Sequence, residues 1–109
     1  MTHIEIIRKG NRTEISILGH ADYCAQGPDI VCAAVSTLSG TFVQCLNDLE
    51  EDGKLWLYEA DVLSGCVKIK VEPKGEAIKQ TNQIIDVIMT GYLLLENKYK
   101  DYVHVTQQE

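Results

Sequence analysis

The chain has 109 residues, enough for a single domain covering residues 1–109 and too few for a second sizeable core. Hydrophobic residues make up 45% and charged residues 24% of the sequence, values typical of a soluble globular protein. The net charge of -6 argues against direct nucleic-acid binding, which requires a positive surface, and it favours a basic protein partner.

The first two segments of alternating hydropathy predict a β-hairpin around a two-residue turn. The segments are residues 2–9 and 12–19, and the turn is Gly10-Asn11. A two-residue loop at this place puts four isoleucines on one face, as a half-buried antiparallel sheet requires. The predicted pairs are Ile6 with Ile15 and Ile4 with Ile17.

From Ile30 to about Glu51 the apolar residues recur in alternating steps of four and three, which is the period of a helix. Asp29 directly precedes this stretch and is a good N-cap residue, whereas Gly53 follows it as a stop signal. The predicted helix therefore has Cys32 as its third residue.

Two further alternating segments, residues 54–59 and 66–71, predict a second pair of strands. We expect their turn near Ala60-Asp61, and Gly65 suggests a bulge before the second strand. The alternation then stops at Pro73 and Gly75, which break a strand pattern.

A second helix with a broad apolar surface is predicted over residues 76–97, and the pattern after it allows a short strand around residues 102–105. The order β-β-α-β-β-α, with or without a last β, indicates an α+β fold. We expect an antiparallel or mixed sheet of four to five strands with two main helices. Part of the second helix is apolar enough to pack against another subunit, so we expect a homodimer.

The four cysteines are expected to be reduced thiols. The first residues lack a basic region followed by a long apolar run, and the apolar runs are too short to span a membrane, so we expect a cytoplasmic protein without a membrane partner. No CxxC pair occurs, and the histidines lack zinc-finger spacing. We therefore expect no disulfide, no metal site and no cofactor.

The stretch from Gly19 to Ser36 combines a histidine, a short loop and a thiol at a helix start. The positive end of a helix contributes about 0.3–1 kcal/mol to an anion, whereas one pKa unit corresponds to about 1.4 kcal/mol. The helix end alone therefore lowers the pKa of a thiol by about one unit or less. Because the Asp29 charge opposes even this, a nearby imidazolium is needed, and His20 is the candidate base and acid for Cys32.

Each of these residues also has a purely structural interpretation. Cys32 could be a small core cysteine, and His20 could be solvated surface at a strand end. Asp29 could cap the helix or orient His20, and capping is the interpretation we favour. Ser36, one turn after Cys32, could support the site or allow close helix packing. The missing side chain of Gly19 allows close approach of backbone or ligand.

The loop of residues 21–28 could be a lid over the thiol or an ordinary connector. Tyr23 and Gly27 are its candidate substrate contacts, whereas Cys24 is interpreted as a bystander. The backbone N–H groups at the helix start, including that of Cys32, are candidates to stabilise an oxyanion.

The combined motif resembles that of the ribosomal-processing cysteine protease family, Prp. The matching residues are Gly19-His20-Ala21, Gly27 and residues 29–36. The resemblance implies a bacterial, homodimeric endopeptidase that removes a short N-terminal extension from a large-subunit ribosomal protein during ribosome maturation. It implies cleavage after aromatic residues in an apolar segment, with Cys32 as the nucleophile and His20 as the general base and acid.

Two other classes of function stay open. The chain could be a non-enzymatic module that binds a ribosomal protein or an assembly factor, with Cys32 in a structural role. It could also be a thiol-dependent hydrolase of another acyl substrate. A cysteine phosphatase is set aside, because such a site needs an arginine soon after the thiol and residues 33–40 contain none.

Overall fold

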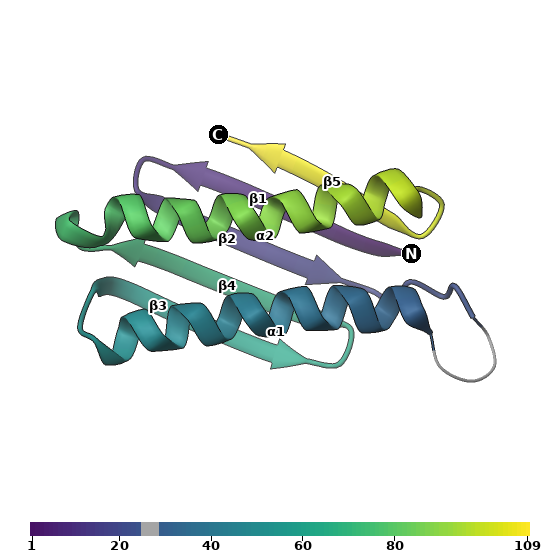
Figure 1. The fold of residues 1–109 in the computed structure, drawn as a ribbon, viewed down its shortest axis with the longest axis horizontal. Helices are drawn as coiled ribbons and strands as arrows, with labels where there is room; N and C mark the ends of the chain where they lie inside the picture. The colour runs from purple at the N-terminus through teal and green to yellow at the C-terminus, as the bar shows by residue number, and fades with distance from the viewer. Residues whose placement is uncertain (25–28) are drawn as a thin grey trace.

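The computed structural model describes residues 1–24 and 29–109. Over these residues the chain forms a five-stranded mixed sheet with two long helices on one face, as Figure 1 shows. The predicted α+β class is confirmed, and the last strand is present. The elements are β1 (Thr2–Lys9), β2 (Arg12–Leu18), α1 (Ile30–Glu51), β3 (Leu55–Leu63), β4 (Cys66–Pro73), the short 3-10 helix η1 (Gly75–Ala77), α2 (Ile78–Lys98) and β5 (Val103–Gln108).

The strands lie side by side in the order β3-β4-β2-β1-β5. All neighbours are antiparallel except β1 and β5, which run parallel because α2 carries the chain back across the sheet. The first hairpin has the predicted register, with Ile4 opposite Ile17 and Ile6 opposite Ile15. These four side chains are buried under the helices, which explains why the alternation in β1 and β2 is so regular.

The second hairpin, β3–β4, is longer than predicted. Its turn is Ser64-Gly65, so a turn near Ala60-Asp61 is wrong, and Gly65 belongs to the turn instead of a bulge. Ala60 lies within the ladder, where it pairs with Ile69. Small and acidic residues weaken a strand pattern without ending it, because pairing to β4 supplies the missing stabilisation.

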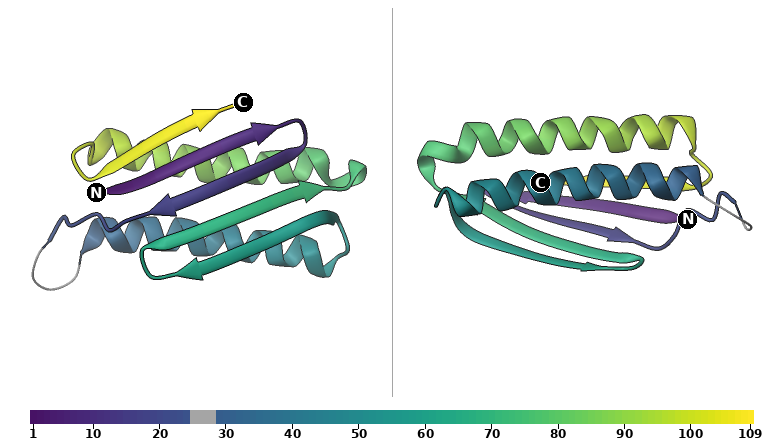
Figure 2. Two further views of the ribbon diagram at one scale, coloured as in Figure 1. Left: turned by 180° about the vertical axis from the view of Figure 1, so that it is seen from behind. Right: turned by 60° about the horizontal axis from the view of Figure 1, so that its bottom comes forward.

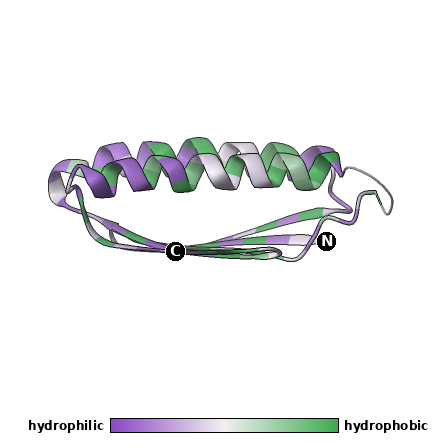
Figure 3. Cartoon of the chain, turned by 90° about the horizontal axis from the view of Figure 1, so that it is seen from below, coloured by the Kyte–Doolittle hydropathy of each residue, from purple (hydrophilic) through white to green (hydrophobic). Residues whose placement is uncertain are grey.

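Both helices cover the same face of the sheet, and Figure 2 shows the opposite face open to solvent. α1 lies toward β3 and α2 toward β1 and β5, with the two layers seen edge on in Figure 3. α1 has the predicted bounds and turns one face into the core between the layers. The buried residues of α1 are Val31, Val35, Ser39, Phe42, Leu46 and Leu49.

By length and composition alone, α1 is long and apolar enough to cross a membrane, with an 18-residue window of mean hydropathy 1.4. The expectation that every apolar run is too short is therefore wrong for this segment. In the fold, Phe42 and Leu46 on this helix are fully buried against the sheet. The fold buries 28% of the residues in that window, and these form the face of α1 that packs on the core.

Candidate active site

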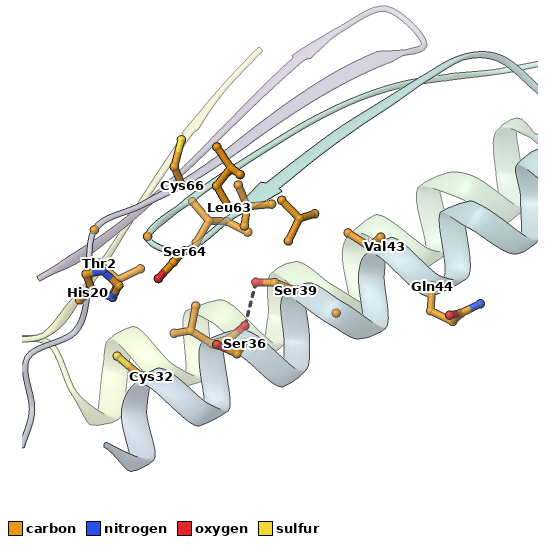
Figure 4. Close-up of a pocket in the computed structure, with 17 residues that line it drawn as sticks. Thr2, His20, Cys32, Ser36, Ser39, Val43, Gln44, Leu63, Ser64 and Cys66 are labelled. Carbon is orange, nitrogen blue, oxygen red and sulfur yellow. Dashed lines mark hydrogen bonds between the residues drawn. The ribbon is translucent and has the colours of Figure 1, made fainter. Parts of the chain in front are cut away.

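A cavity of about 480 Å³ lies between α1 and the β3–β4 hairpin, near the place where β2 ends (Figure 4). Four of the residues singled out from the sequence line it together: Gly19, His20, Cys32 and Ser36. They come from the end of β2 and from the first two turns of α1. The fold therefore brings the candidate base and the candidate nucleophile to one cavity.

Gly19 sets the direction in which the chain leaves β2. Its φ is +90°, a conformation that other residues disfavour, and a Cβ at this place would lie 2.5 Å from the carbonyl oxygen of Met1. Its N–H donates to the carbonyl oxygen of Gly65 at 2.9 Å, which ties the strand end to the second hairpin. The expected close approach at Gly19 is that of the chain's own backbone, and it places His20 at the cavity.

Cys32 is half-buried at the first turn of α1, and its sulfur faces the segment that follows His20. The Ala21 N–H donates to Cys32 Sγ at 3.4 Å. Ala21 is itself buried in the core, so this donor is held firmly against the thiol. Cys32 is not among the fully buried residues of α1, but it packs against the core, so its predicted place off the core face is only partly correct. The segment that carries the candidate base contacts it directly.

The imidazole and the thiol share the cavity without a hydrogen bond between them in the described structure. Figure 4 shows the sulfur of Cys32 pointing from α1 toward the side of the cavity on which His20 lies. The imidazole packs against Gly65, where a Cβ would lie 2.7 Å from Nε2. Catalytic hydrogen bonds often form only when substrate binds. The structure thus holds the two groups near one site as separate, unpaired side chains.

Asp29 is the N-cap of α1 and also the anchor of the preceding loop. Its Oδ1 accepts the N–H groups of Val31 and Cys32, both at 3.0 Å. Its Oδ2 accepts the N–H groups of Tyr23 at 2.9 Å and Cys24 at 3.4 Å. The hydrogen bond from the Cys32 N–H is the largest influence on the pKa of Asp29, which is lowered despite opposing desolvation.

The capping interpretation of Asp29 is therefore confirmed, and this carboxylate does not line the cavity beside His20. One expectation needs correction. The N–H of Cys32 was a candidate oxyanion donor, but it donates to Asp29 Oδ1. An oxyanion would have to compete with a carboxylate for this donor.

Tyr23 does not line the cavity. Its ring makes edge-to-face contacts with Tyr99 and Tyr102, at centroid distances of 5.5 and 5.1 Å. These tyrosines belong to the connection between α2 and β5, so Tyr23 contacts that connection, whereas its N–H is bound to the N-cap of α1. Gly27 lies outside the described residues, and the substrate-contact role of Tyr23 and Gly27 stays a prediction.

The tip of the β3–β4 hairpin supplies cavity residues that sequence reasoning did not single out. Val62 and Leu63 expose apolar side chains at its rim, and Cys66 is a second thiol in the lining. The dipeptide Ser64-Gly65 is a turn signal that the sequence offered. Nothing in the sequence indicated that this turn contacts the His20 imidazole. Within residues 1–24 and 29–109, no three His, Cys, Asp or Glu side chains are grouped to hold a metal ion.

The sequence matches the family model described as Cysteine protease Prp over residues 1–104. Similar solved structures include the essential ribosomal processing protease Prp from S. aureus with a covalently linked product peptide, at 16% identity, TM-score 0.75, and coverage of 98% of this chain and 99% of that one. SMU.848 from Streptococcus mutans is 23% identical, with a TM-score of 0.71 and coverage of 100% and 96%.

The S. aureus protease in complex with a substrate peptide also shares the fold, with 16% identity, a TM-score of 0.71 and coverage of 98% of this chain and 99% of that one. No curated protein matches the sequence. At these identities the solved structures show the fold alone. The family match spans nearly the whole chain and therefore also shows the family. The chain belongs to the cysteine protease Prp family.

Proposed function

We propose that this protein is a cysteine endopeptidase that removes the N-terminal extension of a large-subunit ribosomal protein during ribosome maturation. The observation that carries the proposal is the meeting of Cys32 and His20 at one cavity in a chain of a cysteine protease family. The S. aureus relative, a ribosomal processing protease, binds both substrate and product peptides. This likeness supports the substrate class.

In the proposed reaction the His20 imidazole takes the proton of the Cys32 thiol, and the thiolate attacks the scissile carbonyl carbon. The imidazolium then gives its proton to the departing amine, which leaves an acyl-enzyme on Cys32. Water then attacks this thioester while His20 takes a proton from the attacking water. Collapse of the intermediate releases the new carboxylate and returns the thiol.

Because His20 and Cys32 are not hydrogen-bonded in the structure, the proposal includes an approach of the thiol to the imidazole when peptide binds, with the imidazole keeping its contact with Gly65. The backbone contact of Ala21 with Cys32 Sγ supports a small movement, since the residue after His20 already lies at the sulfur. The loop containing Tyr23 and Gly27 is proposed to contact the substrate during this step, and Ser36 to support the cavity wall.

The cavity suits an extended apolar peptide. Its lining on α1 runs from Cys32 to Gln44, a length of about 18 Å at 1.5 Å per residue. This length accommodates about five extended residues. The opposite wall contains Val62, Leu63 and Val67, which favour apolar side chains. These features support cleavage within an apolar segment.

Cleavage of the ribosomal protein carrying its extension tests the proposal, with the new N-terminus identified by mass spectrometry. We expect Cys32→Ala and His20→Ala to abolish cleavage with unchanged circular dichroism. Cys45→Ala is the matched control, because this half-buried cysteine of α1 does not line the cavity. Cleavage retained in the Cys32→Ala variant would reject the mechanism.

Thiol reactivity separates this enzyme from the alternative, a non-enzymatic module that binds a ribosomal protein. Fast, selective alkylation of Cys32 at neutral pH that is lost in His20→Ala supports the protease. Alkylation of Cys32 as slow as that of Cys45 would favour the binding module.

We also propose that the protein acts as a homodimer in the bacterial cytoplasm. α2 exposes Val87 and Leu94, seven residues apart on one face, with 70% and 65% of their surfaces accessible. An apolar stripe of this kind supports burial against a second copy. Sedimentation that shows only monomer at micromolar concentration would reject the dimer.

A further inference from the structure

The turn of the β3–β4 hairpin lies directly against the candidate base. Gly65 in this turn has a φ of +72°, and its carbonyl oxygen accepts the N–H of Gly19, the residue before His20, at 2.9 Å. Figure 4 shows Ser64, the other turn residue, and His20 on the same side of the cavity, across from Cys32 on α1. The hairpin turn and the base are thus held as one unit.

The space above the α-carbon of Gly65 is filled by the imidazole. A Cβ at this position would lie 2.7 Å from Nε2, 3.2 Å from Cε1 and 3.4 Å from Cδ2 of His20. Real Cβ atoms essentially never approach another heavy atom more closely than 3.0 Å. One edge of the ring therefore rests on the glycine, and a side chain here would displace it.

We propose that Gly65 is a positioning residue for His20, providing the place from which the imidazole acts on Cys32. This inference rests on the proposed function, in which His20 is the base. The titratable side chains that line the cavity in the described part of the chain are His20, Cys32 and Cys66, so displacement of the imidazole removes the base of the site.

The size of the effect follows from the contact. An alanine would force the ring to move by about 0.7 Å to regain an ordinary separation of 3.4 Å from Nε2. Misplacement of a catalytic group by about 1 Å costs on the order of a hundredfold in rate. We therefore expect Gly65→Ala to lower the rate of Cys32 alkylation and the kcat for cleavage by roughly tenfold to a hundredfold.

The experiment compares Gly65→Ala with Gly53→Ala. The backbone at Gly53 has a φ of +70°, against +72° at Gly65, so both variants carry the same strain, but nothing lies within 4 Å of a Cβ at Gly53. The measurements are the pH profile of Cys32 alkylation by iodoacetamide, kcat and KM for the extended substrate, and the Tm.

Gly65→Ala is expected to lower kcat and to shift the alkylation profile toward that of His20→Ala. Gly53→Ala is expected to keep both at wild-type values despite a similar loss of Tm. A folded Gly65→Ala protein with the wild-type kcat and profile overturns the inference. The small reagent makes the result independent of crowding of the peptide in the cavity.

Nuclear Overhauser measurements on the wild-type protein test the contact without any chemistry. We expect a cross-peak between His20 Hε1 and the α-protons of Gly65. Its absence overturns the positioning role even where Cys32 and His20 are shown to cleave the substrate. If the cross-peak is present but His20→Ala leaves the alkylation profile of Cys32 unchanged, the proposed function is refuted. The positioning role is then refuted as well, because it requires His20 to act as the base.

Discussion

The hydrogen bond between Ser39 on α1 and Tyr92 on α2 allows a quantitative test of what holds the two helices together at the cavity, which Ser39 lines. The two oxygens are 2.7 Å apart, and Tyr92 is fully buried. Ser39 Oγ also donates to the Val35 carbonyl oxygen at 2.7 Å. Because a serine hydroxyl has one proton, Tyr92 must donate to Ser39.

Ser39→Ala leaves the Tyr92 hydroxyl buried without a partner, which costs about 1–3 kcal/mol of unfolding free energy. For a chain of 109 residues, with about 2.1 cal/mol/K of unfolding entropy per residue, the Tm should fall by roughly 4–13 °C. Tyr92→Phe removes the donor and leaves Ser39 bonded to Val35, so it should cost only about 0.5–1.5 kcal/mol.

The double variant Ser39→Ala/Tyr92→Phe gives the discriminating result. It buries no unpaired hydroxyl, so it should be more stable than Ser39→Ala alone, although it carries one more substitution. The assay is urea unfolding followed by far-ultraviolet circular dichroism, with equal m-values as the control for two-state behaviour. A double variant less stable than Ser39→Ala would refute this account of the interface.

Three further outcomes are expected. Burial raises the pKa of Tyr92 to about 12, against a smaller lowering by the hydrogen bond with Ser39. The contribution of the neutral Tyr92 hydroxyl to stability is therefore complete below pH 10.0 and is lost as the pH rises through about 12. Alkaline unfolding followed by circular dichroism checks this, because wild type should lose more stability over this pH range than Tyr92→Phe. Asp29→Ala should lower the Tm by a few degrees at neutral pH, and the difference from wild type should narrow as the pH falls through the folded pKa of Asp29, which lies below 3.8; a constant difference would contradict the role of the carboxylate charge. Gly19→Ala should lower the Tm more than Gly10→Ala, because only the former puts a Cβ against the Met1 carbonyl oxygen; equal losses would mean that this contact is unimportant.

The features that could be predicted from the sequence are those with local causes. The first hairpin has its predicted register because a two-residue turn at Gly10-Asn11 leaves one alignment that buries all four isoleucines. The bounds of α1 follow from helical periodicity together with the cap at Asp29. The presence of His20 and Cys32 at one cavity was also anticipated, since only a short loop separates the strand end from the helix.

The features that could not be predicted depend on contacts between distant segments. β3 extends past Ala60, beyond its predicted end at residue 59, because the ladder with β4 stabilises residues whose own strand preference is weak. The direction of Tyr23 is set by Tyr99 and Tyr102, more than seventy residues further along the chain. The hydropathy pattern of the sequence does not predict such contacts, because each depends on the order of strands in the sheet.

The sequence by itself therefore determined the chemical groups of this protein and their local frames: a histidine after a strand, and a cysteine in the first turn of a capped helix. Only the tertiary structure decided how these groups meet. It places the imidazole against Gly65 and brings the thiol and the base to one cavity without a hydrogen bond between them. The physical reason is that local hydrogen bonds and periodicity act within a few residues, whereas a site is assembled by the packing of a hairpin turn against a helix start.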